Sequence, residues 1–313
     1  MTNSKDQLRV SFVEVEPDSA GQRIDNFLLT HLKGVPKSRI YRLLRKGEVR
    51  VNKGRIKPEY KLCSGDSIRI PPIRTSETAP APVPSERLRQ LLLGSVLFEN
   101  DQMLIINKPS GIAVHGGSGI NLGVVETLRY ALGIKKLELV HRIDRDTSGC
   151  LLLAKRRSVL NQLQDQFRAK TVQKHYQTLV EGSWPKHVVE VNAPLLKNQL
   201  KSGERMVQVT QSGKPSVTRF KILQRFDEAT LLQASPVTGR THQIRVHCQF
   251  TGHPIVGDDK YGNADVNKKM REKGFARLFL HAASLTITDI DSGKPFTVEA
   301  PLPAELLKPL ELL

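Results

Sequence analysis

A proline-rich stretch at residues 75–86 constrains the fold of this 313-residue chain more than any other feature. It reads TSETAPAPVPSE, and Pro80, Pro82 and Pro84 favour an extended, semi-rigid backbone that no helix interior or central strand accepts. The stretch therefore predicts a linker between two separately folded domains. The expected parts are a lead-in over residues 1–20, a small domain over residues 21–74 and a large domain over residues 87–313.

Positive charge is concentrated in the small domain. Residues 21–74 hold 14 Lys and Arg and 4 Asp and Glu, an excess of 10 positive charges in a chain whose net charge is +17. A generally basic, solvated surface would spread this charge evenly, whereas a concentrated field favours a polyanionic partner. We therefore expect the small domain to bind nucleic acid.

The small domain reads as two short helices and a few strands. Apolar side chains recur at helical spacing, Ser38 is expected to cap the second helix, and Gly47 is expected to end it. The expected elements are helices over residues 23–32 and 39–46, a hairpin over residues 49–56 that turns at residues 52–54, and a strand over residues 66–70. The candidate nucleic-acid contacts are the basic residues of this region: Lys37, Arg39, Arg42, Arg45, Lys46, Arg50 and Lys53.

In the large domain, a charged segment lies between two apolar runs, residues 137–140 and residues 150–154. It reads HRIDRDTSG over residues 141–149, and this context predicts a polar turn between two strands. Carboxylates held beside arginines stay ionised, so Asp144 or Asp146 is able to act as a nucleophile or a base. From spacing alone, the alternative is a surface cluster of ion pairs, which contributes little to stability.

The rest of the large domain is rich in hairpin-like strands, with a few helices between them. The expected helices cover residues 87–93, 124–132, 158–170 and 241–250, with Thr241 as the cap of the last one. The expected strands cover residues 96–98, 103–106, 172–182, 216–223, 230–234, 279–287 and 295–300. Residues 198–213, with Lys201 and Arg205, are expected to form an exposed hairpin or loop. The pattern predicts an α+β domain with a largely antiparallel mixed sheet.

Cysteine and histidine usage indicates no metal site. Cys63, Cys150 and Cys248 are far apart and odd in number, so they predict neither a disulfide framework nor a metal site. For His242, His247 and Cys248 we expect packing or substrate contact, because their spacing matches no known ligand pattern. No apolar run approaches the roughly 18 residues of a membrane span, and the N-terminus lacks a signal peptide. We expect a cytoplasmic monomer with no membrane contact.

Three segments of the large domain resemble motifs of the RluA family of pseudouridine synthases, in the family's order. HRIDRDTSG closely matches the family signature HRLDxxTSG, which is far more specific than a lone glycine motif. KHYQTLVEG at residues 174–182 and GRTHQIRVH at residues 239–247 resemble the second and third motifs. Upstream, NKPSG at residues 107–111 resembles the family's NKPxG.

The small domain resembles the S4 RNA-binding domain. The similarity covers residues 21–72 and is strongest in the pattern SRxxxLLxxGxVxVNG, which begins at Ser38. Lys53 departs from the pattern, because the family usually has Gly there. With so few aromatic residues in this region, we expect backbone and shape contacts to RNA to matter more than base stacking.

The resemblance implies that the chain isomerises uridine to pseudouridine in RNA. Asp144 would be the catalytic carboxylate, Arg245 its basic partner through a paired hydrogen bond, and Tyr176 the ring that stacks on the target base. Bacterial members with an S4 domain imply 23S ribosomal RNA of the large subunit as the substrate. No cofactor is implied, because nothing is oxidised or transferred from outside. The further residues expected near the substrate are Arg142, Thr147, Ser148, Gly149, Lys108, Arg240, His242 and Gln243.

Two functions of other classes stay open at this point. A non-catalytic RNA binder in ribosome assembly would explain the charge, but not Asp144, Tyr176 and Arg245 together. A Mg²⁺-dependent phosphohydrolase would use residues 144–147 as its DxDxT motif and residues 257–259 as its metal-binding GDD. That enzyme class requires a parallel sheet, whereas this chain reads as hairpins.

Overall fold

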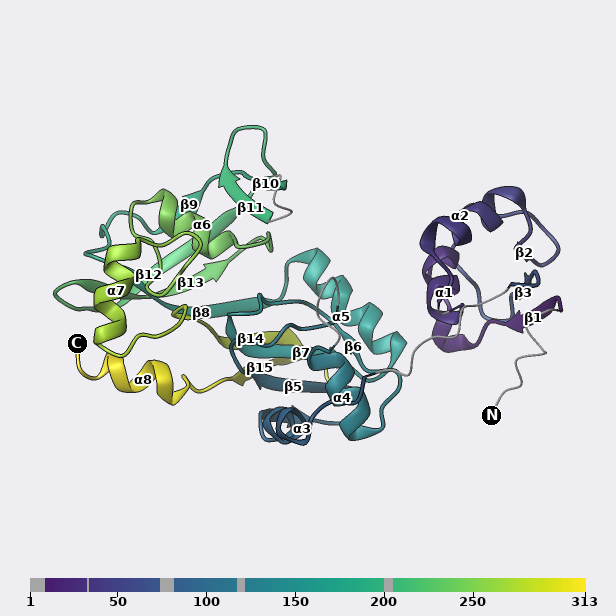
Figure 1. The fold of residues 1–313 in the computed structure, drawn as a ribbon, viewed down its shortest axis with the longest axis horizontal. Coiled ribbons are helices and arrows are strands. Elements are labelled where there is room, and N and C mark those ends of the chain that lie inside the picture. The colour runs from purple at the N-terminus through teal and green to yellow at the C-terminus, as the bar shows by residue number, and fades with distance from the viewer. Residues whose placement is uncertain (1–8, 33, 74–81, 117–121, 200–204) are drawn as a thin grey trace. The chain divides into compact units, whose positions relative to one another are not determined.

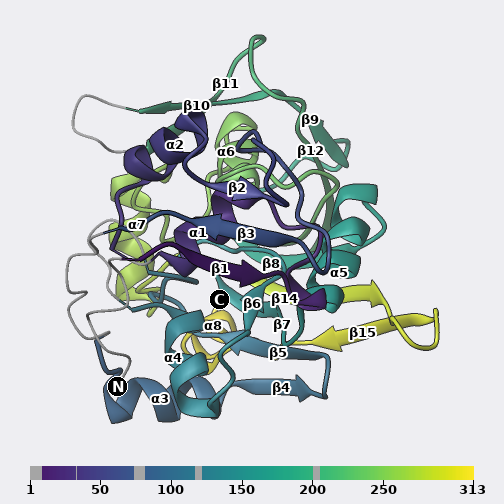
Figure 2. The same cartoon turned by 90° about the vertical axis from the view of Figure 1, so that its right-hand side faces the viewer.

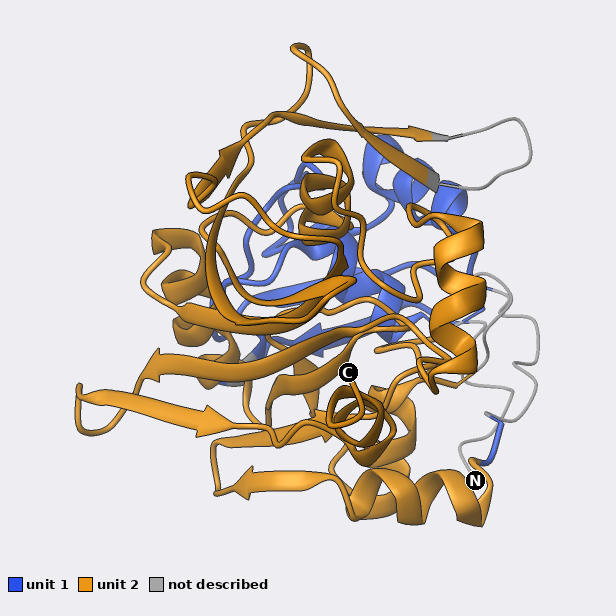
Figure 3. Cartoon of the chain, turned by 90° about the vertical axis from the view of Figure 1, so that its left-hand side faces the viewer, with its two compact units in different colours: residues 1–83 blue, residues 84–313 orange. Residues whose placement is uncertain are grey.

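The computed structural model describes residues 9–32, 34–73, 82–116, 122–199 and 205–313. The chain divides into two compact units, residues 1–83 and residues 84–313 (Figure 3). The division falls within the proline-rich stretch, of which residues 75–81 lie outside the described residues. Helix α3 (Glu86–Leu93) begins the second unit, and the Ser85 hydroxyl caps it by accepting a hydrogen bond from the Leu88 amide.

The described part of the first unit packs helices α1 (Ile24–His31) and α2 (Lys37–Lys46) on a three-stranded sheet. Figure 2 shows the strands side by side, in the order β1 (Ser11–Glu14), β3 (Ser67–Ile70) and β2 (Arg50–Val51). Val13, Ile68 and Val51 form a cross-strand row, and their side chains join those of both helices in one apolar core. Since side chains alternate along a strand, the sheet has one buried face and one solvent face.

Some local expectations for this unit are corrected. Ser38 lies inside α2 and caps nothing, because the helix begins at Lys37, directly after Pro36. The expected hairpin does not form a ladder: β2 ends at Val51, which makes a single bridge to Gly54 and pairs with β3. Residues 1–20, expected as a lead-in, contribute β1 to the sheet.

In the described part of the second unit, ten strands form one sheet (Figure 1). Its path runs through β4 (Val96–Glu99), β5 (Met103–Lys108), β7 (Ser148–Ala154), β14 (Leu280–Thr288), β8 (Gln173–Glu181), β13 (Ala229–Pro236), β12 (Val217–Arg225) and β9 (Glu190–Asn192). Off this path, β15 (Pro295–Glu299) pairs with β14 and β6 (Glu138–Leu139) pairs with β7. The β7–β14 pair is parallel, and the others are antiparallel. The predicted α+β class with a largely antiparallel mixed sheet is confirmed.

Helices and a separate hairpin surround this sheet. They are α4 (Val124–Leu132), α5 (Arg157–Ala169), α6 (Gln243–Phe250), α7 (Ala264–Glu272), α8 (Ala304–Leu310) and the hairpin β10 (Leu195–Gln199)–β11 (Arg205–Val209). Lys201 lies outside the described residues. The sequence did not predict α7, because most of its residues are charged or polar, nor α8, because it contains Pro309. Among the described residues, no helix combines the length and apolar character that crossing a membrane requires.

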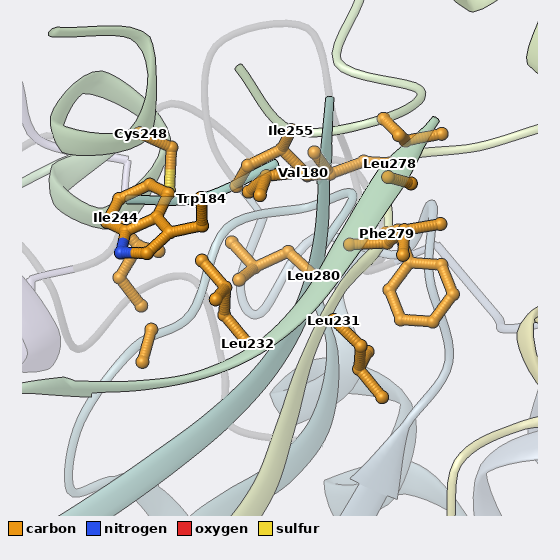
Figure 4. Packing of buried hydrophobic residues seen from close by; sticks show 14 of the residues in the cluster. Val180, Trp184, Leu231, Leu232, Ile244, Cys248, Ile255, Leu278, Phe279 and Leu280 are labelled. Atoms are coloured by element: carbon orange, nitrogen blue, oxygen red, sulfur yellow. The ribbon is translucent and has the colours of Figure 1, made fainter. Parts of the chain in front are cut away.

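A large apolar cluster anchors α6 to the sheet. Ile244 and Cys248 of the helix belong to the same buried cluster as Trp184, Leu232 and Leu280 (Figure 4). Burying a large aliphatic or aromatic side chain contributes about 1.5–3 kcal/mol. The cluster therefore fixes the helix that carries residues 243–250 against β13 and β14.

One cross-strand row runs through the centre of the sheet. Lys108 pairs with Gly149, Gly149 with Ala282, Ala282 with Tyr176, and Tyr176 with Ala234. Gly149 has a φ of +109°, and a Cβ placed there would lie 2.3 Å from the Ala282 carbonyl oxygen. The row brings the start of β7 and the middle of β8 to the same level, and only glycine permits the approach of β7 to β14.

We predict that Gly149→Ala lowers the free energy of unfolding by about 3 kcal/mol or more, because the added methyl group meets fixed backbone. Chemical denaturation measures the change. Gly239→Ala is the matched control, since no atom lies within 4 Å of a Cβ at that position and its φ is ordinary. Equal stability of the two variants would contradict the close approach of β7 and β14.

Candidate active site

Asp144 lies in the loop between β6 and β7, where two pockets meet. One pocket of about 300 Å³ is lined by Asp144, Tyr176 and the segment 238–245. The other, of about 830 Å³, extends from Asp144 toward residues 257–260. The Asp144 side chain is 23% exposed. A carboxylate at this junction is open to a ligand and still partly shielded from water.

Arg245 makes its paired hydrogen bonds with Asp258 and not with Asp144. Its Nε and Nη2 atoms donate to the two carboxylate oxygens of Asp258, each at 2.7 Å. Its Nη1 atom lies 3.9 Å from Asp144 Oδ2, an ion-pair distance without a hydrogen bond. The expected bidentate geometry is therefore present, but its acceptor is Asp258. Spacing along the sequence does not indicate this pair, because Asp258 lies in a separate turn, residues 257–262, that meets α6 only in the folded chain.

The charge on Arg245 is secured by this pair. Burial alone would lower the pKa of Arg245, but hydrogen bonds and the charge of Asp258 raise it above its ordinary value, and Asp144 adds to the effect. The Asp258 carboxylate also accepts from the backbone amides of Lys260 and Tyr261. Arg245 thus presents a fixed positive charge to Asp144 without occupying its oxygens.

The His242 ring is the second nitrogen-bearing group close to the Asp144 carboxylate. It precedes α6 with a φ of 53°, so it, and not the expected Thr241, is the capping residue, although no side-chain bond closes the cap. Its Nδ1 atom lies 2.7 Å from the Tyr261 hydroxyl, and its Nε2 atom lies 3.9 Å from Asp144 Oδ2. Burial lowers the pKa of His242, while the charge of Asp144 opposes that effect. We assign the ring proton to Nε2, with Tyr261 donating to Nδ1.

Tyr176 forms part of the pocket wall from β8. Its ring lines the 300 Å³ pocket together with Asp144 and Ile244. Burial raises the pKa of the Tyr176 phenol, and the charges of Asp144 and Cys150 raise it further. The hydroxyl is therefore protonated at neutral pH, and the ring offers a flat surface beside Asp144.

Lys174 is a pocket residue that the motif comparison left without a role. It stands two residues before Tyr176 on β8, so both side chains project to the same face of the sheet. Its Nζ atom lies 5.9 Å from the centre of the Phe167 ring. Burial lowers the pKa of Lys174. The sequence carried one signal for this placement: Lys174 and Tyr176 stand two residues apart on a strand and therefore share a face.

His141, at the start of the charged segment, is structural. Its ring stacks on Phe167 at 5.0 Å between centroids, and its Nε2 atom accepts a hydrogen bond from the Leu152 amide at 3.1 Å. Burial lowers the pKa of His141 to about 3, with a smaller contribution from the charge of Lys174. The imidazole is therefore neutral, and it ties the loop to β7.

Lys108 lies beneath the loop and does not reach either pocket. Its ammonium group donates to the carbonyl oxygens of Pro109, Ile112 and Arg145, at 2.7, 2.9 and 2.9 Å. Burial lowers the pKa of Lys108 to about 7, against the charges of Asp146 and Asp144. Its expected substrate contact is therefore corrected: Lys108 fixes the loop backbone at Arg145.

Three other expected substrate residues also shape the site from behind. Ser148 is buried, where its hydroxyl bonds His281 Nδ1 at 2.9 Å and accepts from Arg277 at 3.1 Å. Gly149 provides the strand contact described above. Gln243 uses its full capacity on protein partners: Thr238, the Arg240 amide, the Val217 carbonyl and Thr218. Neither Ser148 nor Gln243 has a free polar group to offer a substrate, and Gly149 has no side chain.

The remaining expected residues line the pocket. Arg142 is exposed and borders both pockets, Thr147 is buried in the wall of the smaller one, and Arg240 is exposed at its rim. Asp146 is turned away from this pocket and pairs with Arg145 at 2.9 Å. The two aspartates of the charged segment are therefore placed differently, and Asp144 alone among them lines the smaller pocket.

The constellation that a phosphohydrolase needs is not assembled. Asp146 and Asp258 are paired with arginines, and β7, which follows the loop, lies between antiparallel β5 and parallel β14. Within the described ranges, no group of three or more His, Cys, Asp and Glu side chains is placed to hold a metal ion. His247 is occupied by Thr218 and by the Ala193 carbonyl.

The basic residues expected to contact RNA lie on the surface of the first unit. Arg39 is half-buried and the others are exposed: Lys37, Arg42, Arg45, Lys46, Arg50 and Lys53. Within the part of the chain that the structure describes, no carboxylate lies at ion-pair distance from Arg42 or Arg45. Their charge is available to a polyanion.

Comparisons with known proteins give matches over nearly the whole chain. A family model described as RNA pseudouridylate synthase matches residues 102–250, and a model of the S4 domain matches residues 22–68. The chain is 57% identical over 307 residues to ribosomal large subunit pseudouridine synthase C of Pasteurella multocida, covering 97% of this chain and 94% of that protein. It is 56% identical over 309 residues to the protein of the same name from Escherichia coli K12, covering 97% of each.

Two solved structures share the fold over about two thirds or more of this chain. Human RNA pseudouridylate synthase domain containing 4 superposes with a TM-score of 0.60 and 25% identity, over 72% of this chain and 95% of that one. Human RNA pseudouridylate synthase domain containing 1 gives 0.56 and 28%, over 67% and 83%.

We predict that Asp258→Asn lowers the free energy of unfolding by about 3 kcal/mol or more, because the buried Arg245 loses its charged partner. Chemical denaturation measures this loss. Asp259→Asn is the matched control, since that neighbouring side chain is 81% exposed and pairs with Arg271 at the surface. If both variants unfold alike, Asp258 does not hold Arg245.

Proposed function

The chain belongs to the family of RNA pseudouridine synthases, and from this premise we propose that it isomerises specific uridines of 23S ribosomal RNA, with Asp144 as the catalytic carboxylate. One observation supports the assignment to Asp144 above all others. Among the described residues that line the smaller pocket, only Asp144 has a carboxylate, and Arg245 Nη1 and His242 Nε2 each lie 3.9 Å from its Oδ2 atom.

The reaction rearranges the bonds between the uracil and the ribose of one uridine. The N1–C1′ glycosidic bond of the uridine breaks, the uracil turns, and its C5 atom joins C1′ of the ribose. C5 loses a proton and N1 gains one, so the product is an isomer of the uridine. Asp144 either attacks the ribose carbon or removes a ribose proton, and both routes require an ionised carboxylate. Arg245 keeps a fixed positive charge 3.9 Å from Asp144.

Tyr176 would stack on the uracil. Its ring lies in the wall of the pocket beside Asp144, and stacking on an aromatic ring tolerates the turning of the base. The raised pKa of Tyr176 keeps its hydroxyl protonated. We therefore assign it stacking, and not removal of the C5 proton by a free phenolate.

The target nucleotide has to leave the RNA stack to enter this pocket. A pocket of about 300 Å³ admits one base and part of its ribose, whereas a stacked uridine does not expose C1′ to a carboxylate. Arg142 is exposed at the border of both pockets, where it would contact the RNA backbone or fill the space left by the base. Thr147 and Arg240 would contact the nucleotide.

The substrate class comes from the relatives. The proteins that share 56–57% identity over almost the whole chain are ribosomal large subunit pseudouridine synthases C. We therefore take large-subunit RNA as the partner, and the cytoplasm, where ribosomes assemble, as the place of action. Membership of an enzyme family disfavours the non-catalytic assembly factor.

We predict that Asp144→Asn abolishes pseudouridine formation while RNA affinity stays close to that of the wild type, because RNA affinity comes mainly from cationic side chains. The test is pseudouridine formed per enzyme on a 23S transcript under single-turnover conditions, beside a binding isotherm. Asp146→Asn is the control, since Asp146 pairs with Arg145 away from the smaller pocket. Turnover of Asp144→Asn within about tenfold of wild type, or loss of activity in Asp146→Asn alone, would make the assignment wrong.

We predict that Arg42→Gln together with Arg45→Gln weakens binding of a 23S transcript and flattens its salt dependence. Each phosphate contact that is lost lowers the slope of log affinity against log salt by about 0.7 to 0.9. Arg168→Gln is the control, because that exposed arginine is paired with Asp165. A slope unchanged from wild type would show that α2 does not contact RNA.

A further inference from the structure

The solvent face of the first unit's sheet carries an aromatic ring in line with two arginines. In the β-sheet register, Phe12 of β1 pairs with Arg69 of β3, and Arg69 pairs with Arg50 of β2. Directly paired residues project to the same face of a sheet. Figure 2 shows the three strands side by side, so the row Phe12–Arg69–Arg50 crosses the whole sheet.

This row faces away from the unit's own core. The neighbouring row, Val13–Ile68–Val51, points the other way and packs with α1 and α2. Figures 1 and 2 agree that both helices lie on that side. Phe12 is 68% exposed, which makes it one of the most exposed large apolar side chains among the described residues. An exposed phenyl ring gains nothing from folding, so folding does not explain it.

The two arginines are held in place without being neutralised. Arg69 Nη1 donates to the Glu48 carbonyl at 2.8 Å, and Arg50 Nε donates to the Gly47 carbonyl at 3.2 Å. Both acceptors belong to the backbone that follows α2. Within the described residues, neither guanidinium has a carboxylate at ion-pair distance. The row therefore presents one apolar ring and two available positive charges, with Glu14 and Ser67 next to it on the same face.

We propose that the row Phe12–Arg69–Arg50 is a platform for an unpaired nucleotide of the RNA substrate, with a base stacked on Phe12 and phosphate oxygens at the arginines. Single-stranded nucleic acid is bound in this way, by an aromatic ring for the base and a cationic track for the backbone. The site lies on the sheet, apart from the exposed arginines of α2. Phe12 also lies before the S4 match at residues 22–68, so that match does not account for it.

Charge selects RNA over a protein partner. An apolar protein segment would cover Phe12 but would leave Arg50 and Arg69 buried without counter-ions, which is costly. An RNA strand supplies both a π-face and anionic oxygens. The inference rests on the proposed function in one respect, that the ligand of this chain is RNA.

Phe12→Trp makes the platform visible. The chain has one tryptophan, Trp184, which is 1% exposed and serves as a buried reference. Binding of a short single-stranded oligoribonucleotide to the full-length variant is expected to quench the added fluorescence, because a stacked base contacts the indole. The same sequence as a fully paired duplex is expected to leave it nearly unchanged. Equal quenching by both probes, or none, would overturn the proposal.

Affinity separates stacking from charge. Phe12→Ala is expected to lower affinity for the single strand about tenfold, within the range of stacking on one aromatic ring, and to leave the salt slope unchanged. Phe12→Tyr is expected to retain affinity. Arg69→Gln is expected to lower the slope by about 0.7. Phe250→Ala removes a ring that is 59% exposed on α6 and is the control expected to bind like wild type.

Wild-type binding and isomerisation on a 23S transcript are measured in the same preparation. If the wild type binds and isomerises RNA while Phe12→Ala equals it in affinity, the platform is wrong and the proposed function stands. A Phe12→Ala variant that melts earlier but binds RNA as tightly as wild type would show a structural role and would also overturn the platform. If the wild type binds no RNA, the proposed function fails, and the platform fails with it.

Discussion

The contact between the backbones of Gly149 and Ala282 sets the position of the whole site. β7 and β14 run parallel at this point, and a Cβ on residue 149 would lie 2.3 Å from the Ala282 carbonyl oxygen. Because Ala282 also pairs with Tyr176, the same contact aligns the end of the Asp144 loop with the aromatic ring. Lys108 completes the row from β5 and holds the loop by its backbone at Arg145. The reactive carboxylate is thus placed by strand register and by buried bonds to the loop.

Two carboxylates lie near Arg245, and they have different roles in the electrostatics of the site. Asp258 accepts both paired hydrogen bonds of Arg245, from Nε and Nη2. The guanidinium stays charged, but this pair of donors is no longer available to Asp144. Asp144 feels that charge at 3.9 Å and keeps its oxygens available. A direct bidentate pair between Arg245 and Asp144 would have occupied those oxygens. The arrangement gives the buried Arg245 guanidinium a charged partner and leaves the Asp144 carboxylate accessible within one small volume.

The sequence predicted the elements that carry Asp144 and Tyr176, but not all of the contacts around them. The alternation around Tyr176 and the charged turn at Asp144 are local signals, and both gave the right elements. The partner of Arg245 was not predictable from spacing, because the pair with Asp258 depends on how α6 meets a distant turn. Lys108 was misread for the same reason: its carbonyl acceptors come together only when the loop folds over it. Helix α7 was not predicted from the sequence, because most of its residues are charged or polar and show no apolar repeat at helical spacing.

The proposed function depends above all on one property, the conversion of uridines in large-subunit RNA through the charge of Asp144. Mapping pseudouridine in 23S RNA from cells that lack the protein, and from the same cells supplied with wild type or with Asp144→Asn, tests it most directly. Specific pseudouridines are expected to vanish without the protein, to return with wild type, and to stay absent with Asp144→Asn. An unchanged map in cells without the protein, or full restoration by Asp144→Asn, would contradict it.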